Sequence, residues 1–307
     1  MRDIEMSYYN VYYYCNIIDN LLHLFTTSID WASTGAQFKE CFFAGDIDNF
    51  PKCSALHCFC DYAIRQLVSE EDEKEIEIIQ ERYDSEYAQT LASKNRLKYA
   101  FGDDYKLNQR LWVDRLLSNY GDTNESFYKF IKDEDVNLIS DAYGDFCFLN
   151  GEIDEAVFKL SRELFFVLFQ NREFLYRFNY YMSICNEKRI QRCNIPSWVK
   201  RAVKYRDRGK CVCCGKDLSG LLDCEDENSV HYDHMISLHE GGLNDVFNIQ
   251  LMCRECNLSK SSDSYTFSKY KEIENDKELR EYRYPSSFDP APALVYLIKS
   301  DKLGILP

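Results

Sequence analysis

Two Cys-x-x-Cys pairs constrain the fold of this chain more than any other feature of its sequence. Cys211 and Cys214 form the first pair, Cys253 and Cys256 form the second, and Gly215 allows the tight turn that follows the first. Two such pairs brought together give the tetrahedral thiolate set that selects zinc. The spacing therefore predicts a structural zinc site that holds residues 211–256 in one small finger. The neighbouring thiol of Cys213 could replace Cys214 in that site.

The composition places this finger in a larger folded protein. The 307 residues are enough for two domains, and 45% of them are hydrophobic, as in an ordinary globular chain. Aromatic residues reach 15%, which favours large packed cores or a surface that binds another protein. The net charge of −14 argues against a general coat of positive charge for nucleic acid, so contact with DNA must come from a local basic patch.

A basic run directly before the first cysteine pair supplies such a patch. Residues 187–210 contain nine Lys and Arg residues, and the only acidic ones are Glu187 and Asp207. We expect Lys204, Arg206 and Arg208 to contact the phosphates of a nucleic acid. The alternative is that this run is simply the solvated face of a helix.

The cysteines and the N-terminal residues indicate the cellular compartment in which the protein is expected. The chain has 14 Cys, and its first residues lack the short apolar segment of a secretory signal, so we expect a cytoplasmic protein with reduced thiols. Polar residues interrupt the apolar stretch 11–25, which excludes a transmembrane helix there, and we expect no membrane partner. Cys53, His57, Cys58 and Cys60 leave two interpretations open, a second metal site or buried free thiols.

The hydrophobic periodicity predicts a mainly α fold. Apolar residues recur at three- and four-residue spacing over 8–28, 54–68, 70–101, 105–120 and 152–186. Residues 31–52 contain two Gly and one Pro and are expected to form a loop, whereas 133–149 are ambiguous and could hold a short strand. Pro196 opens a further short helix, with alternating strands expected at 230–236 and 249–252 and a helix at 254–261.

The residues between and after the cysteine pairs resemble those of the HNH endonuclease family. The resemblance rests on Asp233-His234, on Asn248 and on the Asn257-x-x-Lys260 set, and it covers about 60 residues, roughly a fifth of the chain. It implies a ββα-metal finger stabilised by zinc. The predicted fold is therefore a helical N-terminal domain (1–195), a small α+β HNH nuclease domain (196–264) and a short helical tail (265–307).

The resemblance also implies a role for each of these side chains. Asp233 and Asn257 match the ligands of a catalytic divalent cation, and their oxygen atoms suit Mg²⁺ or Mn²⁺ better than zinc. His234 matches the general base that activates water, and Asn248 matches the residue that ties the loop and holds the histidine. Lys260 would offer its charge to a phosphate, unless it is a solvated helix lysine. His231 and His239 receive no firm role.

Three functions are compatible with these residues. The first is a metal-dependent DNA endonuclease, and the second is a nuclease acting on RNA, for example transfer RNA. The third is a non-catalytic zinc finger, which the intact set of matched residues argues against. The resemblance further suggests an antiviral defence context, with a protein partner such as an ATPase bound by the N-terminal domain. A homodimer would be one way to cut both strands.

Overall fold

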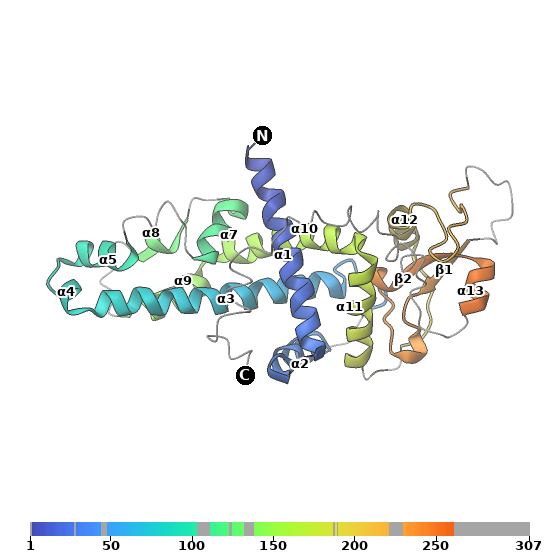
Figure 1. Cartoon of the computed structure of the whole chain (residues 1–307), viewed down its shortest axis with the longest axis horizontal. Helices are drawn as coiled ribbons and strands as arrows, with labels where there is room; N and C mark the ends of the chain where they lie inside the picture. Colours follow the sequence, from blue (N-terminus) through green and yellow to red (C-terminus); the bar gives the residue numbers. More distant parts are fainter. Residues whose placement is uncertain are drawn as a thin grey trace, which may run out of the picture. The chain divides into compact units, whose positions relative to one another are not determined.

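A computed structural model describes residues 2–27, 29–43, 48–102, 111–122, 125–131, 138–186, 188, 190–220 and 230–260. The chain divides into two compact units, one formed by Met1–Leu21 and Ala55–Leu168, the other by Leu22–Ser54 and Phe169–Pro307. The described residues are mostly helical, and a small two-stranded sheet lies in the region of the cysteine pairs (Figure 1). The predicted fold class is therefore confirmed, whereas the predicted tail at 265–307 lies outside the described residues.

The first unit, called here the helical unit, is built on one long helix. Helix α3 (Ala55–Asp84) runs beside α5 (Ser93–Phe101), α7 (Trp112–Tyr120) and α9 (Ile139–Leu149) (Figure 1). The unit also contains the first part of α1 (Arg2–Thr27), α4 (Glu86–Gln89), α8 (Phe127–Ile131) and most of α10 (Gly151–Gln170). No helix among the described residues is long and apolar enough to cross a membrane.

Buried carboxylates fix the ends of two helices in the helical unit. Asp72, in the middle of α3, accepts hydrogen bonds from the backbone N–H groups of Trp112 (2.6 Å) and Val113 (2.9 Å), at the start of α7. Asp114 likewise accepts from the N–H of Phe127 (2.7 Å), where α8 begins. The first N–H groups of a helix have no partner within the helix, so these carboxylates both satisfy them and set the helix positions.

Three sequence expectations are corrected by the helices. Residues 29–43 form helix α2 (Ile29–Phe43) where a loop was predicted, because a single Gly costs a helix only about 1 kcal/mol and the buried Phe38 ring offsets that loss. Residues 139–149 form a helix and no strand. The predicted helix 152–186 is broken at Asn171, whose side chain caps α11 (Arg172–Cys185) by accepting from Phe174 N–H.

The second unit, called here the finger unit, holds the cysteine pairs. Its other elements are α12 (Ser197–Arg206), β1 (Val230–His234), the 3₁₀ turns η2 (Leu238–Glu240) and η3 (Val246–Asn248), β2 (Ile249–Cys253) and α13 (Arg254–Lys260). The strands pair antiparallel, with Val230 opposite Cys253 and His234 opposite Ile249. The predicted strands and the helices at 197 and 254 are thus confirmed. Helix α11 packs on η3, the turn before β2, through Phe178, and the centroids of the Phe178 and Phe247 rings lie 5.0 Å apart.

Candidate functional site

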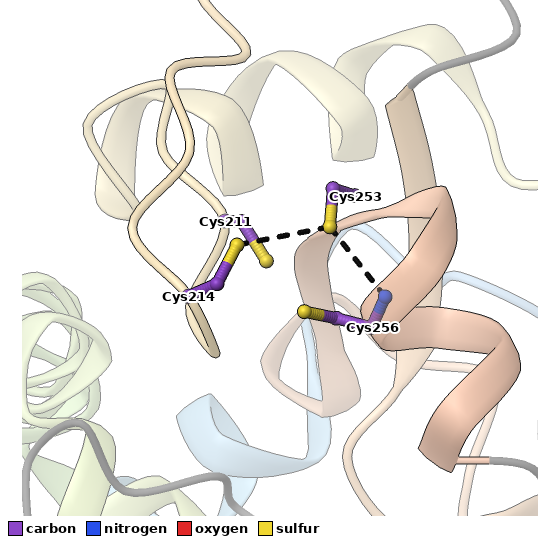
Figure 2. Close-up of side chains that lie close together, drawn as sticks. All are labelled: Cys211, Cys214, Cys253 and Cys256. Carbon is purple, nitrogen blue, oxygen red and sulfur yellow. Dashed lines mark hydrogen bonds between the residues drawn. The ribbon is translucent and has the colours of Figure 1, made fainter.

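The four paired cysteines converge on one point. The Sγ atoms of Cys211, Cys214, Cys253 and Cys256 all lie within 4.8 Å of one another (Figure 2). The first two come from the turn after α12, where Gly215 has a φ of 74° and its N–H bonds to the Cys211 carbonyl. The other two come from the end of β2 and the start of α13. This all-thiolate tetrad fits a structural zinc ion, and it takes Cys214 rather than Cys213.

Among the described residues, no second group of this kind is found. His57 stacks on the Phe165 ring with 3.7 Å between centroids, and Cys60 is fully buried in the helical unit. Cys58 is half-buried and Cys53 is exposed, so the expectation of buried free thiols holds for Cys60 alone.

Asp233 lies on the same side of β1 as His231 and faces helix α13. Its Oδ2 atom accepts from Lys260 Nζ at 2.8 Å, and Asn257 Nδ2 lies 3.1 Å from His231 Nδ1. Asn257 and Lys260 are three residues apart, so they share one face of the helix. The Asp233 carboxylate thus already accommodates a positive charge, and the amide oxygen of Asn257 adds a second hard donor on this face. Such a donor set fits Mg²⁺ or Mn²⁺.

His234, the adjacent residue, is held from the other side by a side chain that the sequence did not reveal. Its Nε2 atom lies 3.0 Å from Asn244 Oδ1. The Asn244 amide nitrogen donates to Asn49 Oδ1 (2.7 Å) and to the Gln191 carbonyl (2.8 Å), so its oxygen must be the end that faces the imidazole. His234 therefore carries its proton on Nε2 and leaves Nδ1 as the proton acceptor.

The protonation state of His234 follows from its surroundings. Burial is the largest influence and lowers the pKa of His234, whereas Asn244 and Asp233 oppose this and Arg192 and Lys260 add to it. The imidazole is therefore neutral near pH 7, which is the state a general base requires.

Asn248 closes the loop between the two strands. It is fully buried, accepts from the Ile236 N–H (2.9 Å) and donates to the carbonyls of Ile236 (3.0 Å) and Leu243 (2.9 Å). A Cβ at Gly242 would collide with the Ile236 carbonyl, so the loop can close this tightly only with glycine there. Asn248 thus holds the loop backbone, while Asn244 makes the side-chain contact with His234.

Lys260 differs from the solvated lysine that the sequence left open. Its side chain is 1% exposed, and besides Asp233 it donates to the backbone carbonyl of His234 at 2.7 Å. The solvated alternative is therefore wrong. Lys260 ties helix α13 to both residues at the end of β1.

A cleft of about 280 Å³ brings these groups to solvent. Asp233, His234 and Lys260 line it, and the neighbouring residues Ile190, Arg192, Ser237, Leu238 and His239 complete its wall. Arg192 is exposed and belongs to the predicted basic run, although the sequence did not single it out. Its position beside the carboxylate and the imidazole makes it available to a phosphate.

The three predicted nucleic-acid contacts separate in the structure. Arg206 is 6% exposed, pairs with Asp207 at 2.9 Å and donates to the Ile249 carbonyl at 2.6 Å, so its expected role at a phosphate is corrected to a structural one. Lys204 donates to the Ser219 carbonyl (2.9 Å), and Arg208 is exposed. Both line an open surface depression of about 820 Å³ beside Arg201 and Tyr205, and the Tyr205 ring is 83% exposed.

A four-cysteine cluster, an antiparallel hairpin whose first strand carries Asp233 and His234, and a short helix that carries Asn257 together form a ββα finger with a tetrad that fits zinc. Residues 211–263 match the family model for HNH endonuclease, and this segment is therefore an HNH domain. Comparisons of the chain with curated proteins and with solved structures find no match. The HNH domain supports nuclease activity or nucleic-acid binding, and the residues outside it carry no assignment from these comparisons.

Proposed function

We propose that this chain is a metal-dependent endonuclease that hydrolyses phosphodiester bonds of DNA. The observation that carries the proposal is the pairing of two groups in one cleft, a neutral His234 with a fixed tautomer and the carboxylate of Asp233. A base that can accept a proton at neutral pH beside an oxygen ligand for a cation is what hydrolysis of a phosphodiester requires.

The side chains divide the work as follows. His234 Nδ1 takes a proton from the attacking water, and Asn244 holds the ring so that this nitrogen is the acceptor. Asp233 and Asn257 would hold Mg²⁺ or Mn²⁺, which when bound supplies positive charge for the phosphate and the leaving oxygen. Asn248 keeps the loop closed, and Lys260 keeps α13 against β1. The zinc tetrad joins the two halves of the finger and takes no part in the reaction.

Two surfaces support the substrate and partner proposals. The exposed Arg201, Arg208 and Tyr205 beside the finger offer charge to a phosphate backbone and a ring for base stacking. In the helical unit, Phe148 is 88% exposed and Phe166 is 60% exposed, which suits binding of another protein. We therefore extend the proposal to a cytoplasmic antiviral nuclease that works with a protein partner, an ATPase being the type suggested by the family resemblance.

The test is cleavage of supercoiled plasmid by zinc-loaded protein in Mg²⁺ or Mn²⁺, with His234→Ala and EDTA as controls. Nicking that both controls abolish is the expected result. Cleavage by His234→Ala at the wild-type rate would sink the mechanism. If total RNA is cut and plasmid is not, the substrate is RNA and the DNA assignment fails. A homodimer would appear as linear product that forms without accumulation of nicked circles.

A further inference from the structure

Asp233 has a direct cross-strand neighbour that the functional assignment has not used. Gln250 lies opposite Asp233 in the register of β1 and β2, so both side chains stand on one face of the hairpin. Its Nε2 atom lies 3.3 Å from Asp233 Oδ2, and the residue is fully buried. A buried amide in contact with a proposed metal ligand is placed to control how that ligand points.

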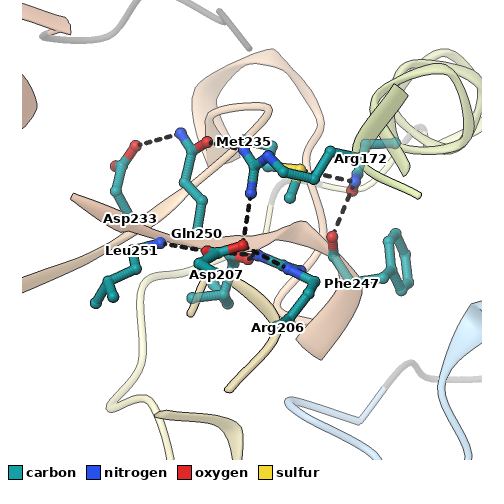
Figure 3. A network of polar contacts seen from close by, with 10 residues as sticks. Arg172, Arg206, Asp207, Asp233, Met235, Phe247, Gln250 and Leu251 are labelled. Atoms are coloured by element: carbon teal, nitrogen blue, oxygen red, sulfur yellow. Dashed lines mark hydrogen bonds and ion pairs between the residues drawn. The ribbon is translucent and has the colours of Figure 1, made fainter. Parts of the chain in front are cut away.

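The other end of the Gln250 amide is fixed by an arginine from helix α11. Arg172 donates a guanidinium N–H to Gln250 Oε1 at 3.0 Å (Figure 3). A guanidinium can only donate hydrogen bonds, so the amide oxygen must face Arg172 and the amide NH₂ must face Asp233. The donor chemistry of Arg172 alone therefore fixes which end of the Gln250 amide faces Asp233.

Arg172 is itself held in place by a buried carboxylate. Asp207 accepts from Arg172 at 2.9 Å, from Arg206 at both of its oxygens, and from the Leu251 N–H at 2.9 Å (Figure 3). The side chains of Arg172, Arg206 and Asp207 are all nearly inaccessible to solvent. Both oxygens of Asp207 are thus occupied by donors, and this buried arrangement holds Arg172, and through it Gln250, in place.

We propose that Gln250, oriented by Arg172, is a positioning residue that presents the Asp233 carboxylate to the divalent cation. Gln250 and Lys260 both contact Oδ2 of Asp233, so Oδ1 is the oxygen turned toward the ion. This inference rests on the proposed function, in which Asp233 is a metal ligand. Arg172 lies outside the segment 211–263 that matches the HNH family. In this proposal, the metal site is therefore completed by Arg172, a residue of the finger unit that lies outside the HNH domain.

The experiment measures Mn²⁺ binding to the zinc-loaded full chain, from the electron paramagnetic resonance signal of free Mn²⁺. Gln250→Met keeps the side-chain length and removes both polar ends. We expect Mn²⁺ to bind about 10-fold to 100-fold more weakly, the usual effect of losing a hydrogen-bond partner behind a ligand. Asn179→Leu is the matched control, because Asn179 is also a buried amide of the finger unit and bonds to the Phe247 carbonyl (3.1 Å).

A second pair of variants tests the link to α11. Arg172→Met leaves Asp207 paired with Arg206, and it is expected to weaken Mn²⁺ binding nearly as much as Gln250→Met does. The double variant should bind no more weakly than Gln250→Met alone, because Arg172 acts through Gln250. Additive losses would overturn that coupling. If Gln250→Met fails to fold by circular dichroism, Gln250→Asn replaces it, since the shorter amide cannot span both partners.

The outcomes separate this inference from the function on which it rests. Wild-type affinity for Mn²⁺ in Gln250→Met, or an equal loss in Asn179→Leu, would overturn the positioning role while leaving the nuclease proposal intact. Asp233→Ala provides the other test. If that variant binds Mn²⁺ as the wild type does, Asp233 is no ligand and both proposals fall.

Discussion

The two units of this molecule bury polar side chains in different ways. In the helical unit, Asp72 and Asp114 accept from backbone N–H groups at the starts of α7 and α8, so their partners are parts of the fold itself. In the finger unit, Asn244, Gln250 and Lys260 bond to His234 or Asp233, which both line the cleft. Burying a polar group costs free energy unless it is hydrogen-bonded, and each of the buried side chains named here has hydrogen-bond partners.

The two units differ in what their buried hydrogen bonds hold in place. In the helical unit the two carboxylates bond to backbone N–H groups and to the Tyr143 hydroxyl, so the result is a fixed arrangement of helices. In the finger unit the bonds hold the His234 imidazole and the Asp233 carboxylate, two groups that line a cleft. The comparison suggests that loss of a buried polar group should cost stability in the first unit and activity or metal binding in the second. Four predictions test this, in order of decreasing effect.

Removal of zinc should unfold the finger unit and spare the helical unit. Structural zinc contributes about 10 kcal/mol or more to the folding of small fingers. Cys253→Ser should therefore abolish protection of β2 amides in hydrogen exchange, while amides of α3 keep theirs. Cys213→Ser is the matched control, because this thiol lies outside the tetrad. Equal loss of protection in both variants would contradict the assignment of the zinc ligands.

Two opposing titrations are expected in the helical unit. Burial raises the pKa of Asp72 from 3.8 to about 6, so its native state binds protons more tightly and stability falls as pH rises from about 4 to 6. Burial lowers the pKa of His57 from 6.5 to about 4, so the unfolded state binds protons more tightly and stability falls as pH drops through that window. The two contributions have opposite signs. That of Asp72 is on the order of 3 kcal/mol, and that of His57 is smaller because this ring is partly exposed and solvent screens its charge.

In the wild type, the contributions of Asp72 and His57 are expected to oppose each other between pH 4 and 6. In Asp72→Asn only the His57 titration remains, so the helical unit should lose stability as the pH falls. In His57→Phe only the Asp72 titration remains, so stability should rise as the pH falls, and the phenyl ring keeps the stack on Phe165. Chemical denaturation followed at α3 by hydrogen exchange measures both. Trends of the same sign in the two variants would show that one assignment is wrong. Plasmid cleavage should be unchanged, as the comparison requires.

Loss of the Asn244 side chain should lower activity more than stability. Asn244→Ala frees the His234 ring from its fixed tautomer, and a loss of positioning of this kind reduces the cleavage rate by about 10-fold to 100-fold. Asn179→Ala removes another buried amide of the finger unit that has no bond to His234. The measurement is single-turnover cleavage beside a thermal melt. Equal rates in the two variants would break the comparison.

The smallest effect is expected for the exposed basic residues. Arg208→Ala should weaken DNA binding only a few-fold at moderate salt and reduce the slope of log affinity against log salt by about one. The control is Lys94→Ala, an exposed lysine of the helical unit, which should leave the slope unchanged. A fluorescence anisotropy titration at several salt concentrations measures both. An unchanged slope for Arg208→Ala would remove this residue from the interface.

Short-range patterns in the sequence were enough to predict the two cysteine pairs, β1, β2 and α13, because each depends on spacing within a few residues. The roles proposed for Asp233, His234 and Asn257 came from the resemblance to the HNH endonuclease family. Asn244 and Arg172 were missed because their partners Asn49 and Gln250 are 195 and 78 positions away along the chain. Arg206 was placed at the surface because a run of positive charge does not tell which side of a helix is buried.

The contact between Asn49 and Asn244 has a consequence for how this site can be inherited. Recombination moves continuous stretches of a gene, and a stretch encoding residues 196–264 would carry the four cysteines, Asp233 and His234 to a new host. It would leave behind Asn49 and Arg172, which lie in earlier parts of the chain. A transplanted finger would therefore arrive folded around its zinc, and its new neighbours would have to supply the side chains that orient the imidazole and the carboxylate.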